Sequence, residues 1–311
     1  MVYLVVTIDV EPDCTVSWNY SNPLTFQGVS IGIRERLQPL FNKYAITPTY
    51  LINNVVLEDF QSVDVFKKLE GKFELGTHLH PEFLEPDKTI FDYAGAKGEA
   101  NCCFYPTEIE SAKIENITNR FTEKFGYVPV SFRAGRFSSG TNTYRTLSEL
   151  GYKVDTSITP HILWNDRTRE QPVDYQHVPE QPYIIYDRLL EVPISIVQKS
   201  EFSFRELIKS GIGLRRKVSF HKNIWLRPVY STYNEMVELI HIFKKKYMNQ
   251  TDIVLNMMFH NVEVMPSLSP YSATENDCTA YMNLLEQFFI LCNRLGVVSI
   301  NLSSLYDFYK R

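Results

Sequence analysis

The segment ELGTHLHP at residues 74–81 places His78 and His80 two positions apart at the end of a short apolar run. In an extended segment the side chains alternate between two faces, so both imidazoles point the same way. An earlier strand-like segment ends in Asp9 and Glu11, which share a face for the same reason. Two imidazoles and a carboxylate from neighbouring strands can form a three-ligand site with an open coordination position, as catalytic zinc sites do. The two segments together therefore predict a hydrolytic metal site.

The composition limits the class of protein. The chain has 311 residues, of which 44% are hydrophobic and 22% charged, as is ordinary for a soluble globular protein. Chains of this length commonly fold as one α/β barrel. The net charge of -4 and the pI near 6.0 give no general attraction to nucleic acid. We therefore expect one domain over residues 1–311 and no nucleic-acid partner.

The cysteines and the N-terminus indicate the compartment. The five cysteines are odd in number and contain no CxxC pair, so they predict neither a disulfide framework nor a thiolate zinc site. The first apolar run lacks a basic region before it and stops at Asp9, which is too short to span a membrane. The sequence thus predicts a cytoplasmic protein without a transmembrane segment; it does not indicate an oligomeric state.

Apolar strand-like runs alternate with amphipathic helical patterns along the chain. Strands are expected at residues 3–8, 47–51, 73–77, 131–133, 154–157, 253–259 and 297–301, and helices at 32–44, 108–125, 141–150, 233–247 and 280–295. Gly126, Gly151 and Gly296 follow helical runs and are typical stop signals. This alternation predicts an α/β fold with parallel strands and crossover helices, and the polar candidates fall where barrel enzymes build their sites, at the carboxyl ends of strands.

The stretch from about 159 to 232 interrupts this alternation and is rich in proline, aromatic and basic residues. A long irregular insertion in a compact enzyme usually covers the substrate or forms a small subdomain. We expect Trp225 and Arg227 within it to contact the substrate. The basic cluster at 215–217 is expected to be a solvated face, with phosphate binding as the alternative.

Five motifs resemble, in order, those of the polysaccharide deacetylase family (carbohydrate esterase family 4), most closely its branch associated with surface polysaccharides. They are TIDVE at 7–11, ELGTHLHP at 74–81, FRAGR at 132–136, YKVDTS at 152–157 and MFHNVE at 258–263. Each motif alone is weak, whereas five in the family's order cover most of the chain. The resemblance implies an irregular (β/α)7-type barrel of the deacetylase kind.

Two features depart from the usual pattern of this family. The metal histidines of the family are usually four positions apart, whereas His78 and His80 are two apart. The two carboxylates are usually adjacent, whereas Asp9 and Glu11 are separated by one residue. The second change keeps both carboxylates on one face of an extended segment, which favours a shared site.

The resemblance implies a metal and a base. Glu11, His78 and His80 would hold a divalent metal, for which Zn²⁺ is expected. Such an ion can lower the pKa of a bound water from about 15.7 to about 7 and can polarise a carbonyl. Asp9 would be the general base that takes a proton from the water.

The resemblance to this family also implies a general acid and residues that orient the general base. Arg133, paired with Asp155, would orient the general base and keep it ionised, because a nearby positive charge favours the charged carboxylate. His260 has a suitable unperturbed pKa to protonate the departing amine. Backbone N–H groups near Gly135 and Arg136 would meet the oxyanion.

The activity implied is a metal-dependent amidohydrolase that removes an acetyl or formyl group from an amino sugar, with a nucleotide- or lipid-linked sugar as the expected form of the substrate. Two alternatives remain open at this point. An allantoinase-like enzyme would cleave a C–N bond in a small cyclic amide on the same fold. A carbohydrate-binding protein without catalytic activity would bind sugar in an aromatic groove and would not need the metal.

Overall fold

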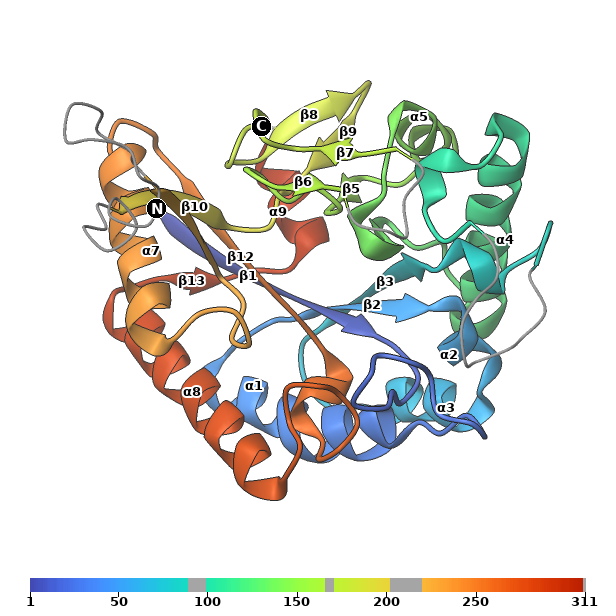
Figure 1. Cartoon of the computed structure of the whole chain (residues 1–311), viewed down its shortest axis with the longest axis horizontal. Helices are drawn as coiled ribbons and strands as arrows, with labels where there is room; N and C mark the ends of the chain where they lie inside the picture. Colours follow the sequence, from blue (N-terminus) through green and yellow to red (C-terminus); the bar gives the residue numbers. More distant parts are fainter. Residues whose placement is uncertain (89–98, 166–170, 202–219, 310–311) are drawn as a thin grey trace, which may run out of the picture.

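A curled, largely parallel sheet forms the centre of the molecule, as the computed structural model shows for residues 1–88, 99–165, 171–201 and 220–309 (Figure 1). Its strands lie in the order β12, β1, β2, β3, β4, β5, β9, β8, with β13 paired to β1. Every pairing is parallel except that of β8 with β9. The strands of the sheet are β1 (Val2–Val10), β2 (Thr49–Asn53), β3 (Glu74–Leu79), β4 (Ser131–Ala134), β5 (Val154–Asp155), β8 (Tyr183–Tyr186), β9 (Leu189–Glu191), β12 (Ile253–His260) and β13 (Val298–Ser299).

Helices lie on the outside of the curled sheet (Figure 1). The α-helices are α1 (Gln38–Tyr44), α2 (Asn54–Glu58), α3 (Phe60–Lys68), α4 (Thr107–Phe125), α5 (Thr141–Glu149), α7 (Tyr233–Lys246), α8 (Glu275–Arg294) and α9 (Leu302–Tyr309). A π-helix, η1 (Gly28–Leu37), precedes α1, and short 3₁₀ turns are η2 (Pro81–Phe83), η3 (Cys102–Phe104), η4 (Gly135–Phe137) and η5 (Asn261–Val264). The turns η4 and η5 follow β4 and β12 directly, and η2 follows β3 after His80. They therefore continue the chain at the edge where the candidate site residues lie.

The predicted deacetylase-like α/β barrel fold is confirmed. Each of the seven predicted strand regions contains a strand of the sheet, because long apolar runs such as that of β1 are buried on both faces. Helices occur in all five predicted regions, although the first region is a π-helix followed by α1. Gly126, Gly151 and Gly296 have φ values of 80°, 86° and 67°, as expected for helix stop signals. The sequence prediction missed β8, β9, α2, α3 and α9.

The barrel is irregular between β9 and β12. Individual backbone hydrogen bonds connect the chain there, in place of a continuous pairing of two strands. Ser195 donates its N–H to the carbonyl of Asn256 at 3.0 Å, and its own carbonyl accepts from Leu226 at 2.8 Å. Met258 in turn donates to the carbonyl of Leu226 at 3.3 Å. The residues just before β10 (Ile196–Glu201) and just after β11 (Phe220–Trp225) therefore bridge this gap in the sheet.

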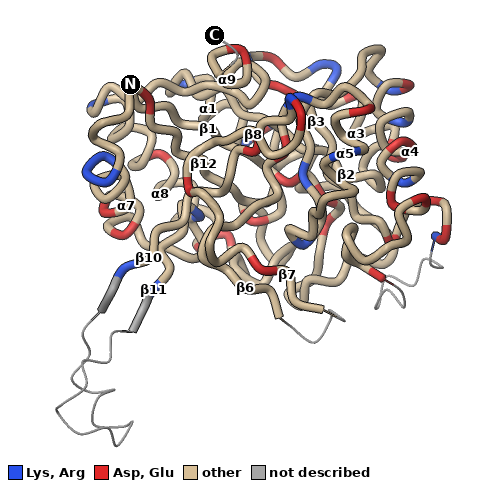
Figure 2. Tube along the Cα trace, turned by 90° about the horizontal axis from the view of Figure 1, so that it is seen from above, with Lys and Arg blue, Asp and Glu red and all other residues tan. Residues whose placement is uncertain are grey.

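The predicted insertion at about 159–232 contains short antiparallel pairs. They are β6 (Leu163–Trp164) with β7 (Val173–Asp174), and β10 (Ile196–Glu201) with β11 (Phe220–Trp225). β10 and β11 lie side by side (Figure 2), and Ile196, Val197, Ile224 and Trp225 are buried in the core. Glu180 anchors the insertion to α7, because its carboxylate accepts from Lys246 at 2.8 Å while it pairs with His161 at 2.6 Å. The basic cluster predicted at 215–217 lies outside the described residues.

Candidate active site

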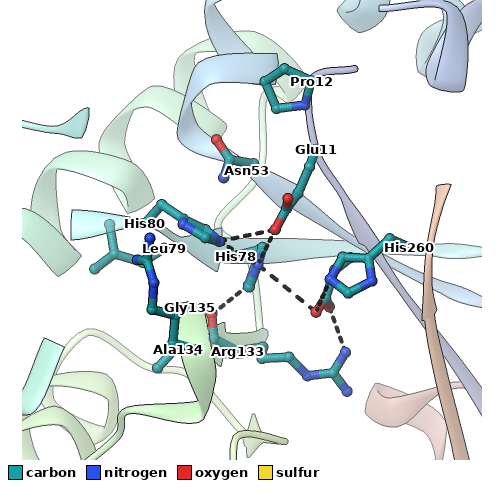
Figure 3. Close-up of polar contacts among 12 residues, drawn as sticks. Glu11, Pro12, Asn53, His78, Leu79, His80, Arg133, Ala134, Gly135 and His260 are labelled. Carbon is teal, nitrogen blue, oxygen red and sulfur yellow. Dashed lines mark hydrogen bonds and ion pairs between the residues drawn. The ribbon is translucent and has the colours of Figure 1, made fainter. Parts of the chain in front are cut away.

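Three candidate ligand atoms converge at the carboxyl ends of β1 and β3. Glu11 Oε1 lies 3.1 Å from His78 Nε2 and 2.9 Å from His80 Nε2, and the two Nε2 atoms are 3.1 Å apart (Figure 3). All three side chains are buried. Within the described part of the chain, this is the group of histidine, cysteine and carboxylate side chains close enough to share one metal ion. The two-residue spacing thus brings both imidazoles to Glu11.

The ring orientation of each histidine leaves Nε2 available for a metal. His78 Nδ1 lies 3.1 Å from the carbonyl oxygen of Arg133, a geometry in which Nδ1–H donates and Nε2 keeps its lone pair. His80 Nδ1 lies 3.5 Å from Glu82 Oε1. One carboxylate oxygen and two imidazole nitrogens form a donor set that suits Zn²⁺ and other divalent transition metals better than Mg²⁺ or Ca²⁺. The residues present therefore fit a catalytic metal ion.

Electrostatics favour the ionised form of the carboxylate ligand. Burial raises the pKa of Glu11, but the adjacent His80 and His78 outweigh burial and hold this pKa well below its usual range. Burial lowers the pKa of His80, whereas Glu11 and Glu82 raise it, and the balance brings it to about 9. The pocket thus concentrates negative charge around the imidazoles, which also favours a bound cation.

Asp9 lies between the metal ligands and His260. Its Oδ1 accepts a hydrogen bond of 2.5 Å from Arg133, and its Oδ2 lies 3.8 Å from His78 Nε2 and 3.9 Å from His260 Nε2 (Figure 3). Burial raises the pKa of Asp9, but Arg133, His78 and His260 lower it by more, so the pKa stays below its usual range. The β1–β12 register, which pairs Asp9 with His260, brings these two side chains together. Asp9 is therefore an ionised carboxylate with one oxygen directed toward the centre of the site.

Arg133 holds Asp9 from within the core. Its side chain is fully buried, and its guanidinium donates to Thr7 Oγ1 at 2.7 Å and to the carbonyl of Thr156 at 2.9 Å as well as to Asp9. The predicted ion pair between Arg133 and Asp155 is not among the ion pairs of the described residues. The physical reason is that β4 and β5 pair in a register that directs the guanidinium to Thr156, the residue after Asp155.

Asp155 instead forms a buried pair with Glu191. The two residues are register partners in β5 and β9, and each is fully buried. Asp155 Oδ1 accepts from Ser157 at 2.6 Å, and Glu191 Oε1 accepts from the N–H of Ile158 at 3.1 Å. Burial raises the pKa of Asp155 to about 6, and burial together with Asp155 raises the pKa of Glu191 well above its usual range. Burial thus favours a protonated carboxyl in this pair. Asp155 is linked to β4 through Ser157, whose Oγ accepts the N–H of Ala134 at 2.8 Å.

The expected oxyanion segment packs directly against the ligand His80. A Cβ atom at Gly135 would lie 2.8 Å from the carbonyl oxygen of Leu79 and 3.1 Å from the ring of His80, so glycine permits this close approach. Arg136 has a φ of 53° and donates to Glu82 at 2.6 Å. The role of this segment toward an oxyanion stays a prediction. Its observed role is to support His80 and its partner Glu82.

Trp225 and Arg227 are both buried, and their expected contact with the substrate stays a prediction. The guanidinium of Arg227 bonds Glu263 Oε1 at 2.8 Å and lies 4.3 Å from the ring centroid of Tyr230. Trp225 is one of a row of six rings in which successive centroids are 5.5 to 6.3 Å apart. The row begins at Trp18, whose ring centroid is 5.0 Å from that of His260, and continues through Tyr271, Tyr230, Trp225, Trp164 and Phe137.

Two residues that support the metal ligands were missed by the sequence analysis. Glu82 is fully buried behind His80, and Asn261 bonds the backbone of Glu11. Glu82 immediately follows the motif at 74–81, and Asn261 lies within the motif at 258–263, so their position in sequence was an available signal. Nothing in the sequence indicates which backbone or side chain each of them reaches.

No family model and no curated protein matches this sequence. Among solved structures, a Mycobacterium smegmatis protein provisionally described as a polysaccharide deacetylase is similar with a TM-score of 0.55 and 14% identity, over 98% of this chain and 89% of that chain. PuuE allantoinase is similar with a TM-score of 0.53 and 12% identity, over 98% and 88% of the two chains. A GH57-type branching enzyme from Pyrococcus horikoshii has a TM-score of 0.56 and 11% identity, over 99% and 70%.

These similarities establish the deacetylase-like (β/α) barrel fold. The named proteins have different activities, so the fold alone does not select one, and the function depends on the site residues. In the part of the chain that the structure describes, no helix combines the length and hydrophobicity needed to cross a membrane.

Proposed function

We propose that this chain is a metal-dependent hydrolase that removes an N-acyl group from an amino sugar. The observation that carries the proposal is the convergence of Glu11 Oε1, His78 Nε2 and His80 Nε2 beside an ionised carboxylate and a third histidine. When bound at these three atoms, a divalent ion supplies a nucleophilic water near neutral pH and polarises the acyl carbonyl. Zn²⁺ is the proposed ion.

Asp9 is the proposed general base. Its Oδ2 carries no direct hydrogen bond from Arg133, which bonds Oδ1, so Oδ2 is the oxygen placed to accept a proton from the attacking water. Arg133 keeps Asp9 ionised and fixes its orientation because the guanidinium is anchored at Thr7 and Thr156.

His260 is the proposed general acid, and its Nε2 lies 3.9 Å from Asp9 Oδ2. As the water oxygen bonds to the acyl carbon, the C–N bond breaks and the amine nitrogen takes a proton from His260 Nε2. The products are a carboxylic acid and a free amino sugar. Transfer of the proton from Asp9 Oδ2 to His260 Nε2, which lies 3.9 Å away, then returns both groups to their starting protonation states.

The aromatic row beside His260 supports a sugar substrate, because aromatic faces offer apolar area together with polar edges. We further propose the finer features of the expected function: an acetyl or formyl group, a nucleotide- or lipid-linked amino sugar, and a role in surface polysaccharide biosynthesis in the cytoplasm. The similarity to PuuE allantoinase keeps a cyclic-amide substrate as the competing activity on this fold.

The test is acyl release by Zn²⁺-loaded protein from a panel of N-acetyl and N-formyl amino sugars, free, nucleotide-linked and oligomeric, with allantoin alongside. We expect acetate or formate from at least one sugar and none from the His80→Ala variant. Ring opening of allantoin to an open-chain acid, monitored as loss of allantoin, with no acyl release from any sugar, would replace the proposal with the cyclic amidohydrolase. Sugar binding that survives metal removal, with no turnover of any compound, would indicate a carbohydrate-binding protein without catalytic activity.

A further inference from the structure

Two polar groups contact Nδ1 of His260, the ring nitrogen other than the one nearest Asp9. His260 Nδ1 lies 2.8 Å from Glu263 Oε1 and 3.2 Å from Arg227 Nη2. Arg227 Nη2 in turn lies 2.8 Å from the same Glu263 oxygen. A guanidinium only donates hydrogen bonds and a carboxylate only accepts them, so these contacts restrict the location of the imidazole proton.

The distances favour one arrangement. If Nδ1–H and Arg227 Nη2–H both donate to Glu263 Oε1, the two shortest contacts are both normal hydrogen bonds. The 3.2 Å separation of His260 Nδ1 and Arg227 Nη2 is then the spacing of two donors that share an acceptor. In the opposite tautomer, the Nδ1 lone pair would lie 2.8 Å from a carboxylate oxygen and the contact would be repulsive. The arrangement therefore places the proton on Nδ1.

Glu263 is well suited to remain an ionised acceptor. Its carboxylate is fully buried, and its second oxygen accepts from the hydroxyl of Tyr281 at 2.9 Å. Burial raises the pKa of Glu263, but Arg227 and His260 outweigh burial and keep this pKa below its usual range. A buried carboxylate without a cation would be costly, and Arg227, itself only 4% exposed, supplies the compensating charge.

The same contacts determine which nitrogen of His260 is reactive. With Nδ1–H donated to Glu263, the lone pair of the neutral ring is on Nε2, which lies 3.9 Å from Asp9 Oδ2. Nε2 then binds a proton in the imidazolium form and releases it toward the site. Because Glu263 is neutralised by Arg227, His260 contacts a balanced ion pair and not a bare negative charge.

We propose that Glu263 and Arg227 are positioning residues for His260: Glu263 fixes the Nδ1–H tautomer, and Arg227 holds the Glu263 carboxylate in place, so that Nε2 is the nitrogen that exchanges a proton with the substrate. This inference rests on the proposed function for its kinetic consequence, but its tautomer is measurable without any activity. It gives Arg227 a role different from the substrate contact predicted from the sequence.

The first test is the ¹⁵N signature of His260 in Zn²⁺-loaded protein labelled at histidine, with the signal assigned by its loss in His260→Gln. The wild-type protein is expected to show the neutral Nδ1–H tautomer at alkaline pH. A double variant, Arg227→Met with Glu263→Leu, removes both charges and leaves neither buried alone. In that variant the signal should shift to the Nε2–H tautomer that is more common in solution or to a mixture of tautomers.

Kinetics form the second readout. The double variant should lose about 10- to 100-fold in kcat, the usual effect of removing an outer partner of a reactive histidine, with KM changed by less than about threefold. Glu263→Gln keeps an acceptor for Nδ1–H and should retain the wild-type tautomer with a smaller loss of kcat. Glu180→Gln is the matched control, because Glu180 pairs with His161 and Lys246 in a similar way. It should leave both the His260 signal and kcat unchanged.

An Nε2–H tautomer in the wild-type protein, or an unchanged His260 signal in the double variant, would overturn the inference. Absence of deacylation by wild-type protein that shows the expected tautomer and its loss in the double variant would refute the proposed function while supporting the positioning role of Glu263 and Arg227. The two failures are therefore distinguishable.

Discussion

The side-chain amide of Asn261 pairs with the backbone of Glu11 from both sides. Asn261 Oδ1 accepts the Glu11 N–H at 2.8 Å, and Asn261 Nδ2 donates to the Glu11 carbonyl at 3.1 Å. Both residues are buried, and Glu11 lies one residue past the end of β1. The amide therefore determines where the carboxylate ligand sits.

We predict that Asn261→Ala weakens metal binding while the fold is retained. Loss of both hydrogen bonds frees the Glu11 backbone, and partners of this kind typically change metal affinity by about 10- to 100-fold. Competition of Zn²⁺ with a chelator of known affinity measures the change. Asn293→Ala, on the outer face of α8, is the control and should leave the affinity unaltered. Equal affinities for the wild-type protein and Asn261→Ala would show that the amide does not determine the ligand position.

Gly28→Ala should weaken metal binding through the same amide. A Cβ atom at position 28 would lie 2.6 Å from Asn261 Nδ2, a distance at which one of the two must move. In the Asn261→Ala background that obstacle is absent, so the second substitution should cost less there than in the wild-type protein. Additive effects of the two substitutions in a double-mutant cycle would contradict this coupling.

Asp9→Asn should retain bound metal and lose about 10²- to 10⁴-fold in kcat, the usual contribution of a general base. The asparagine keeps an oxygen for Arg133 but cannot accept the proton of the attacking water. Single-turnover rates and elemental analysis on the same preparation measure both properties. Loss of the metal in Asp9→Asn would instead make Asp9 a ligand, and the roles of Asp9 and Glu11 would be shared or exchanged.

The Asp155–Glu191 pair predicts a fall in stability as the pH rises. An unfolded carboxyl group titrates near pH 4, whereas the folded pKa of Asp155 is about 6 and that of Glu191 is raised further. The folded state therefore binds more protons than the unfolded state above about pH 4, and the free energy of unfolding decreases as pH rises through the folded pKa values.

Asp155→Asn should flatten this dependence, because the amide donates to Glu191 at every pH. Urea denaturation at several values between pH 5 and pH 8 measures the free energy of unfolding. Asp174→Asn replaces an exposed carboxylate of the insertion and should follow the wild-type curve. Parallel curves for the wild-type protein and Asp155→Asn would show that the pair does not hold a proton.

The sequence was sufficient for the parts of the fold and site that depend on local patterns. Long apolar runs ending in polar residues predicted β1, β3 and β12, and period-two spacing predicted the shared faces of Asp9 with Glu11 and of His78 with His80. The short strands β8 and β9 were missed because three or four residues inside an irregular insertion carry too little periodicity.

The sequence could not predict which side chains form ion pairs and hydrogen bonds with one another. Arg133 reaches Asp9 and not Asp155, and Arg227 is buried against Glu263, because sheet register and the closure of the barrel decide which charges meet. Asn261 and Glu11 lie 250 positions apart in the chain, and only the fold brings them together.

The metal content of the ligand variants tests the central claim most directly. After reconstitution with Zn²⁺ and removal of excess metal, elemental analysis should find about one ion per chain in the wild-type protein and strongly reduced amounts in His78→Ala, His80→Ala and Glu11→Gln. Circular dichroism on the same samples checks that the fold is intact. Full occupancy in both histidine variants would contradict the assignment of Glu11, His78 and His80 as the metal site.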